Sequence, residues 1–417
     1  MTRLLVPEMF GVMAIANILI VGLQLCSYFG IHHNIIQSQK GDEPSFLNTA
    51  WTFQIIRGLV IFLLAICLAA GLFLANSFGF VGESSAYHNP VLPGVLAVLS
   101  LTALISGFES TNLASANRAM RMGRLTILEL ISQVIGLAGM IVWAVIDKSI
   151  WALVAGTILS SCTRTLLSHW FIKGLTNRLM WDRAIFSELF TFGKWMLLTT
   201  ILGYLVSSGD RLVLANLVNA DVLGVYTIAL FITGALQEVM SKLTTNAALP
   251  VLSKVVRERR EELSLVYYKI RLPIDLAVLF LCGILFYAGH LITDVLYDHR
   301  YESAGHMLEI LAVSMFAIRY ILSEQVYIAF GKPRLLMPVQ ILQLLVTFSV
   351  IAPVYKAYGL DGAIWVIALT PLLALPVTAY FMVKYGFFNL RREILVLPAL
   401  PAGLAFGALT NMVAQRF

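Results

Sequence analysis

Four cations lie inside segments that are otherwise apolar, namely Arg57, Arg164, Lys242 and Arg319. A charged side chain within a membrane span costs at least about 2.5 kcal/mol on insertion scales, so such a residue is a functional candidate by default. Arginine suits a diphosphate because its planar guanidinium donates two parallel hydrogen bonds. The cations therefore predict a binding site for a phosphate-bearing molecule. The alternative is that these long side chains extend to the membrane surface.

Four further residues are candidates for energy coupling or for gating: Asp210, Arg211, Glu238 and Glu324. Glu238 lies four residues before Lys242 on one predicted helix, a spacing that favours an ion pair over a proton relay. Glu324 follows Arg319 by five residues and lies on another face, which leaves its carboxyl group able to titrate. The adjacent Asp–Arg pair lies near the outer end of a span. It predicts an outer gate, or alternatively a local cap or ion pair.

Neither a cofactor nor a metal site is expected. The four cysteines show no CxxC or CxxH spacing. No D-x-D motif for a metal-bound nucleotide sugar lies on a loop. We therefore expect a protein that is not an enzyme. If it couples its activity to an energy source, we expect a proton or sodium gradient.

The elements that position these residues are membrane helices. Of the 417 residues, 59% are hydrophobic and 12% are charged, whereas a soluble domain carries about 25% charged residues. The apolar residues form runs long enough for a helix to cross about 30 Å of hydrocarbon. The sequence predicts an all-α polytopic membrane protein with about twelve spans: 9–30, 51–75, 93–113, 127–147, 150–172, 193–215, 222–248, 270–293, 304–330, 335–354, 360–383 and 395–413.

The basic residues orient these spans. Lysine and arginine favour cytoplasmic loops, and 19 of the 29 fall on one side of alternating loops, against six on the other and four within spans. The side with 19 is predicted to be cytoplasmic. This topology accounts for the net charge of +6, so no nucleic-acid partner is expected. The basic run Arg257 to Arg260 is interpreted as a solvated loop, with a patch for membrane lipid or a partner as the alternative.

An internal repeat organises the chain. Residues 8–16 and 221–229 share the pattern acidic, x, large apolar, Gly, Val, x, x, Ile, Ala, and both open a span from the outer side. Two bundles related by an axis along the membrane normal give such a parallel repeat. A full span precedes the second copy only, so we expect the first helix of the first half to be absent, with divergence of the halves as the alternative. The predicted parts are a five-span bundle at 1–172, a connector at 173–192, a six-span bundle at 193–383 and an extra span at 384–417.

Several motifs resemble the polysaccharide transport family, the Wzx-type flippases of the multidrug/oligosaccharidyl-lipid/polysaccharide exporter superfamily. They are Arg3-Leu4-Leu5-x-Pro7-Glu8-x-Phe10-Gly11, Phe192-Gly193-Lys194-Trp195, Asp210-Arg211-x-x-Leu214 and Leu223-Gly224-x-Tyr226-x-x-Ala229. The similarity runs over nearly the whole chain, and it implies two helical bundles around a central cavity.

The resemblance also implies a function and a location. The chain is expected to flip a polyprenyl-pyrophosphate-linked oligosaccharide, such as an O-antigen, exopolysaccharide or capsule unit, across the bacterial inner membrane by alternating access. Expected partners are that lipid-linked oligosaccharide, membrane lipids, and a polysaccharide polymerase and glycosyltransferases. One alternative is a multidrug or cation antiporter of the same superfamily, which would favour acidic cavity residues. The other is a membrane polymerase or ligase, which the short outer loops disfavour.

Overall fold

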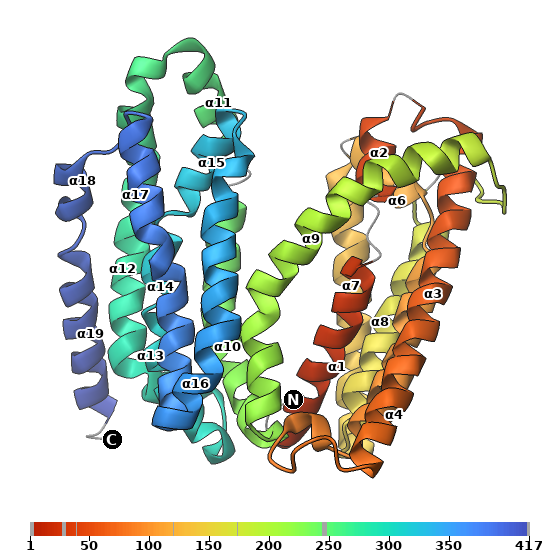
Figure 1. Cartoon of the computed structure of the whole chain (residues 1–417), viewed down its shortest axis with the longest axis horizontal. Coiled ribbons are helices and arrows are strands. Elements are labelled where there is room, and N and C mark those ends of the chain that lie inside the picture. The colour runs from red at the N-terminus through yellow and green to blue at the C-terminus, as the bar shows by residue number, and fades with distance from the viewer. Residues whose placement is uncertain are drawn as a thin grey trace. The chain divides into compact units, whose positions relative to one another are not determined.

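The computed structural model describes residues 4–26, 31–38, 40–119, 121–172, 174–243 and 248–414. Throughout these ranges the regular elements are helices, and no strand occurs among them. The prediction of an all-α chain is therefore confirmed. The chain divides into two compact units (Figure 1). The first comprises Met1–Ser208 and Val218–Asp221, and the second comprises Gly209–Leu217 and Val222–Phe417.

Long helices joined by short ones build the first unit. In chain order they are α1 (Pro7–Cys26), α2 (Ile31–Gln37), α3 (Pro44–Ser77), η1 (Ala86–His88), α4 (Leu92–Leu99), α5 (Leu101–Gly107), α6 (Asn112–Arg118), α7 (Met122–Ile146), α8 (Trp151–Trp170) and α9 (Arg183–Leu217). α3 packs against α4 and α5, and α8 packs against α5 and α7. Proline suits the start of α3 because it has no N–H to leave unpaired in the first turn.

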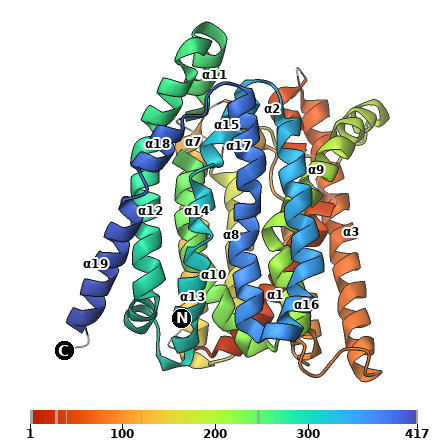
Figure 2. The same ribbon diagram turned by 60° about the vertical axis from the view of Figure 1, so that its left-hand side comes forward.

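The second unit also takes the end of α9 and most of α10. Its helices are α10 (Ala220–Leu243), α11 (Leu249–Glu258), η3 (Arg260–Glu262), α12 (Leu263–Leu296), η4 (His299–Tyr301), α13 (Glu302–Ala312), α14 (Met315–Ile318), α15 (Ile321–Ala329), η5 (Pro333–Leu336), α16 (Met337–Leu369), η6 (Thr370–Leu373), α17 (Ala374–Lys384), α18 (Leu390–Leu395) and α19 (Ala399–Ala414). α12 packs against α13 and α19, and α13 packs against α16. Figure 2 shows α19 running alongside α12.

The described helices are suited to a membrane. Seven are long and apolar enough to cross one, and two bent helix pairs raise the number to nine. Each of the twelve predicted spans overlaps a helix or a broken helix. The segment Met337–Lys384 contains two predicted spans, separated at Gly359, where φ is 69°. The chain is therefore a multi-pass membrane protein, and the number twelve stays a prediction.

Close backbone contact fixes α19 on α12. A Cβ atom on Gly283 of α12 would lie 2.5 Å from the carbonyl oxygen of Leu400, and one on Gly403 would lie 2.1 Å from that of Phe280. Small residues at such crossings allow two helices in a membrane to pack backbone to backbone. Larger residues at these two positions would force the helices apart.

The two copies of the sequence repeat open α1 and α10. Each helix carries its acidic residue in the first turn, Glu8 in α1 and Asp221 in α10, where the helix dipole favours negative charge. The matched Val, Ile and Ala positions are buried in both copies. The repeated residues thus have the same positions in two helices of the chain.

Candidate functional site

The candidate site begins at a break between α5 and α6. The helices on either side of the break are bent by 60°. A broken helix leaves carbonyl groups without partners, which is tolerated in a membrane protein only where other groups satisfy them. Gln54 of α3 does so here, because its Nε2 donates to the carbonyl oxygens of Ser106 at 3.0 Å and of Glu109 at 3.2 Å. Glu109 is thereby held beside α3.

A glycine brings α3 close to this break. A Cβ atom on Gly58 would lie 2.7 Å from the carbonyl oxygen of Ala103, so a larger residue does not fit. The preceding residue, Arg57, is half-buried, and its Nη2 donates to the carbonyl oxygen of Gln24 at 3.0 Å. Gln24 belongs to the last turn of α1, where the helix dipole favours a cation. Arg57 is therefore held by its surroundings in a fixed position.

These groups line one pocket of about 180 Å³ in the first unit, which we call the arginine pocket. Its walls are formed by Gln24, Ile31, His32, Gln54, Arg57, Gly58, Ile61, Ala103, Ser106, Gly107, Glu109 and Arg164. Arg164 Nε lies 3.2 Å from Glu109 Oε1, and the side chains are 42% and 14% exposed, respectively. The lining thus carries two arginines against one carboxylate, which gives it a net positive charge. Chemically, the pocket is suited to bind an anion.

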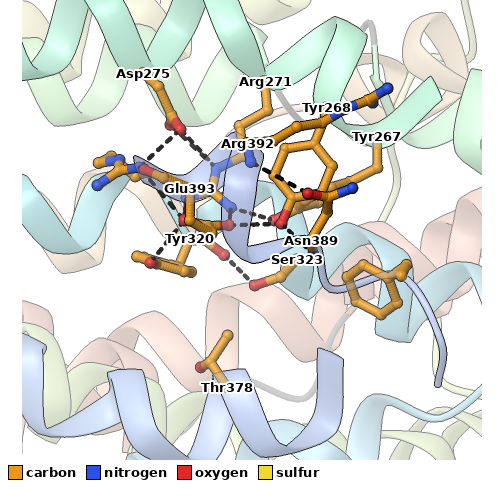
Figure 3. Close-up of polar contacts among 12 residues, drawn as sticks. Tyr267, Tyr268, Arg271, Asp275, Tyr320, Ser323, Thr378, Asn389, Arg392 and Glu393 are labelled. Carbon is orange, nitrogen blue, oxygen red and sulfur yellow. Dashed lines mark hydrogen bonds and ion pairs between the residues drawn. The ribbon is translucent and has the colours of Figure 1, made fainter. Parts of the chain in front are cut away.

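Arg319, another predicted site residue, lies in the second unit. It directly follows α14, and its side chain is buried, with 1% exposed. Its Nη2 atom lies 3.1 Å from Asp275 Oδ2 and 3.4 Å from Glu393 Oε2. Arg271 of α12 is fully buried and contacts the same two carboxylates. Its Nε atom lies 3.0 Å from Asp275 Oδ2, and its Nη2 atom donates a hydrogen bond to Glu393 Oε2 at 2.9 Å. We call Arg271, Asp275, Arg319 and Glu393 the buried charge cluster; Figure 3 labels Arg271, Asp275 and Glu393. Two positive and two negative charges balance within it, as burial requires.

Tyrosines complete the buried charge cluster. Tyr268 OH donates to Glu393 Oε1 at 2.8 Å, and Tyr320 OH donates to Glu393 Oε2 at 3.0 Å. The Arg271 guanidinium lies 4.4 Å from the centroid of the Tyr320 ring, within the range of a cation–π contact. The cluster thus ties α18 to α12 and to the turn before α15. That Arg319 also binds a cargo molecule stays a prediction.

The remaining predicted residues are found at separate places. Asp210 accepts a 2.5 Å hydrogen bond from Tyr226 OH, and Arg211 Nε lies 3.9 Å from Asp210 Oδ1. Glu238 on α10 and Glu324 on α15 are exposed. The side chain of Lys242 lies outside the described residues, as does its predicted pairing with Glu238. The structure thus brings Arg57 together with Arg164, and Asp210 with Arg211, whereas Arg319 lies in the other unit from the arginine pocket.

Some of these residues were not predicted. Arg271 was not among the predicted site residues, although it lies within α12 and its side chain is fully buried. Its spacing of four residues from Asp275 on one helix was the available signal. Glu393 binds Arg271 across 122 residues of sequence, and no local pattern indicates such a contact. Glu109 lies at a helix break that apolar periodicity alone does not reveal.

Comparison with known sequences identifies the family. Residues 1–306 match the model of a family described as polysaccharide biosynthesis protein. Over 271 residues the chain is 23% identical to the lipopolysaccharide biosynthesis protein WzxC of Escherichia coli (strain K12), covering 65% of this chain and 52% of WzxC. Over 229 residues it is 22% identical to the amylovoran biosynthesis protein AmsL of Erwinia amylovora, covering 54% of this chain and 58% of AmsL. The chain spans about half the length of the curated relatives it matches.

Comparison with solved structures identifies the fold. The lipid II flippase MurJ, in an inward closed conformation, matches with a TM-score of 0.71 at 12% identity, covering 98% of this chain and 86% of MurJ. An inward-facing multidrug resistance transporter of the MATE family, in the MOP superfamily, matches with a TM-score of 0.64 at 17% identity, covering 94% of this chain and 89% of the transporter. These two proteins are named as a flippase and a transporter, and the likeness to them shows the fold. The chain belongs to the polysaccharide biosynthesis protein family and has the fold of MOP superfamily transporters.

Proposed function

We propose that this protein is a flippase that moves a polyprenyl-pyrophosphate-linked oligosaccharide from the cytoplasmic to the outer leaflet of a bacterial inner membrane. The observation that carries the proposal is the pocket shared by Arg57 and Arg164. Both arginines come from segments that are otherwise apolar, where a charge is costly and needs a function or a partner. Glu109 pairs with Arg164, and the pocket lining carries two arginines against one glutamate, which favours an anionic head group.

The pyrophosphate is the part of the cargo that opposes transfer through hydrocarbon, because it carries the charge. Guanidinium groups replace water around phosphate oxygens by paired hydrogen bonds. Arg57 already donates to a backbone carbonyl, and the side chain of Arg164 is 42% exposed. We assign to Arg164 the direct contact with phosphate and to Arg57 a fixed positive charge beside it. No bond to the cargo forms or breaks.

We further propose that transport proceeds by alternating access. The head group binds in the arginine pocket from the cytoplasmic side while the polyprenyl chain stays in lipid. Rocking of the bundle at 1–172 against the bundle at 193–383 then exposes the head group to the outside. A proton or sodium gradient drives the cycle, with Glu324 as a candidate carboxyl group and Asp210 and Arg211 at the outer gate. A polysaccharide polymerase and glycosyltransferases supply and use the cargo.

The proposal is tested by the leaflet distribution of polyprenyl-linked oligosaccharides in cells with and without this protein. A membrane-impermeant saccharide probe is applied to intact cells and to inverted membrane vesicles. The proposal predicts that loss of the protein shifts the oligosaccharide to the cytoplasmic leaflet. An unchanged distribution, in cells without a second flippase gene, would contradict it. Increased drug sensitivity without that shift would favour the antiporter alternative.

A further inference from the structure

A second pocket belongs to the second unit and is lined by α12 and α18. Its volume is about 320 Å³, and its walls are formed by Leu265, Tyr268, Lys269, Leu272, Asp275, Arg392, Leu395 and Val396. We propose that this pocket binds the phosphate head group of an anionic glycerophospholipid of the membrane. We call it the α12–α18 pocket. The lipid is a resident ligand and not the transported cargo.

The residues that line each wall of the pocket lie on one face of a helix, as their spacing indicates. On α12 they are residues 265, 268, 269 and 272, and on α18 and just beyond it they are residues 392, 395 and 396. Residues three and four apart lie on the same side of a helix. Each face combines a cation with exposed leucines, since the exposed fractions are 55% for Leu265, 41% for Leu272 and 67% for Leu395. Such a surface suits a molecule with an anionic head and apolar chains.

The positively charged groups are Lys269 and Arg392. Lys269 is exposed and Arg392 is half-buried. The Arg392 guanidinium lies 5.6 Å from the centroid of the Tyr268 ring, and its Nη1 donates to the carbonyl oxygen of Leu265 at 3.5 Å. These contacts place Arg392 over the pocket wall. Phosphate oxygens are acceptors only, so two cations at the rim provide the matching donors.

The carboxylate in the pocket does not oppose this assignment. Asp275 is bound by Arg271 and Arg319, and Glu393 is bound by the same two arginines. The buried charge cluster is therefore neutral, and Lys269 and Arg392 add a net charge of two at its edge. An anion is favoured over a zwitterion or a cation.

The predicted topology gives the source of the ligand. Lys269 and Arg392 lie just outside the predicted spans 270–293 and 395–413, at ends that the distribution of basic residues predicts to be cytoplasmic. Anionic lipids attract basic residues next to the membrane at that surface. A glycerophospholipid in the pocket would contact α12 and α18 at once and hold α18 in place.

The test uses the full-length purified protein and measures retained phosphatidylglycerol by native mass spectrometry, with the thermal unfolding midpoint as a second measurement. The variant is Lys269→Gln with Arg392→Gln. The matched control is Lys384→Gln with Arg391→Gln, which removes the same charge from exposed residues outside the pocket. We expect the pocket variant to bind phosphatidylglycerol about tenfold to thirtyfold more weakly. We expect the control to bind as the wild type does.

Other ligands and the control variant test the assignment further. Phosphatidylcholine should bind the wild type weakly, and soluble glycerol 3-phosphate should not raise the unfolding midpoint, because it lacks the chains that cover the leucines. Equal loss in both double variants would reduce the effect to general charge and overturn the site. Displacement of phosphatidylglycerol by a stoichiometric amount of a polyprenyl pyrophosphate would overturn the lipid assignment in favour of cargo.

Discussion

Arg164 Nε lies 3.2 Å from Glu109 Oε1 in the pocket that also contains Arg57. Glu109 lies at the break between α5 and α6, whereas Arg164 lies within the continuous helix α8. The contact joins an irregular segment to a rigid one and offsets part of the charge of Arg164. Glu109 therefore sets how strongly the pocket attracts an anion.

Replacing Glu109 by Gln should strengthen the binding of a pyrophosphate. The change removes one negative charge next to Arg164 while it keeps the size of the side chain. A partly exposed charge pair contributes up to about 1 kcal/mol, so we expect about threefold to fivefold tighter binding of a short-chain polyprenyl pyrophosphate. Titration calorimetry on the purified protein measures this. Unchanged or weaker binding would show that Arg164 does not meet the phosphate.

Replacing Glu393 by Gln should destabilise the second unit. Two buried arginines would then share one carboxylate, and removal of one partner from a buried ion pair costs about 3–5 kcal/mol. A lower thermal unfolding midpoint in detergent is the expected result.

The double variant Arg271→Gln with Glu393→Gln provides the control for that prediction. It restores equal numbers of positive and negative charges in the buried charge cluster. We expect it to be more stable than the single Glu393→Gln variant, although less stable than the wild type. A double variant less stable than the single Glu393→Gln variant would contradict the interpretation that the charges in the cluster balance.

Replacing Tyr226 by Phe should release Asp210. The Tyr226 hydroxyl donates to Asp210 Oδ2 at 2.5 Å, and Tyr226 is 1% exposed. A hydrogen bond to a charged group contributes about 1.5–3 kcal/mol. The variant should lose about that much stability, whereas Tyr358→Phe, at an exposed tyrosine, should not. Equal midpoints for the wild type and the Tyr226 variant would argue against this pairing.

Asp298, between α12 and η4, should give stability that depends on pH. The side chain of Arg300 donates hydrogen bonds to it and lowers the pKa of Asp298 below its ordinary value. A carboxyl group with a lowered pKa stabilises the fold above its unfolded pKa, and the contribution is lost as the pH falls through the folded pKa. Asp298→Asn should therefore remove part of the acid-induced loss of stability, measured as unfolding midpoints between about pH 3 and 7. The exposed Glu83→Gln variant should retain it.

The fold was predictable because the membrane imposes long apolar runs with a fixed minimum length. Arg57 and Arg164 were predictable as candidates for the same reason, since charge within such runs is rare. Their shared pocket was not, because it depends on the break after Gly107 and on the close approach at Gly58. Contacts such as Arg271 with Glu393 join residues that are distant in sequence, and a single sequence carries no record of that pairing.

The most direct measurement of the central claim is flipping by purified protein in proteoliposomes. The cargo is a fluorescent polyprenyl-pyrophosphate-linked saccharide, and a membrane-impermeant quencher reports its leaflet. The wild type should move the cargo across the bilayer. Arg57→Ala with Arg164→Ala should reduce the rate at least about tenfold at equal reconstituted amount, with Arg124→Ala, at an exposed arginine of the same unit, as the control. Equal flipping by the wild type and the double variant would contradict the role of the arginine pocket, and no flipping by the wild type would contradict the proposed function.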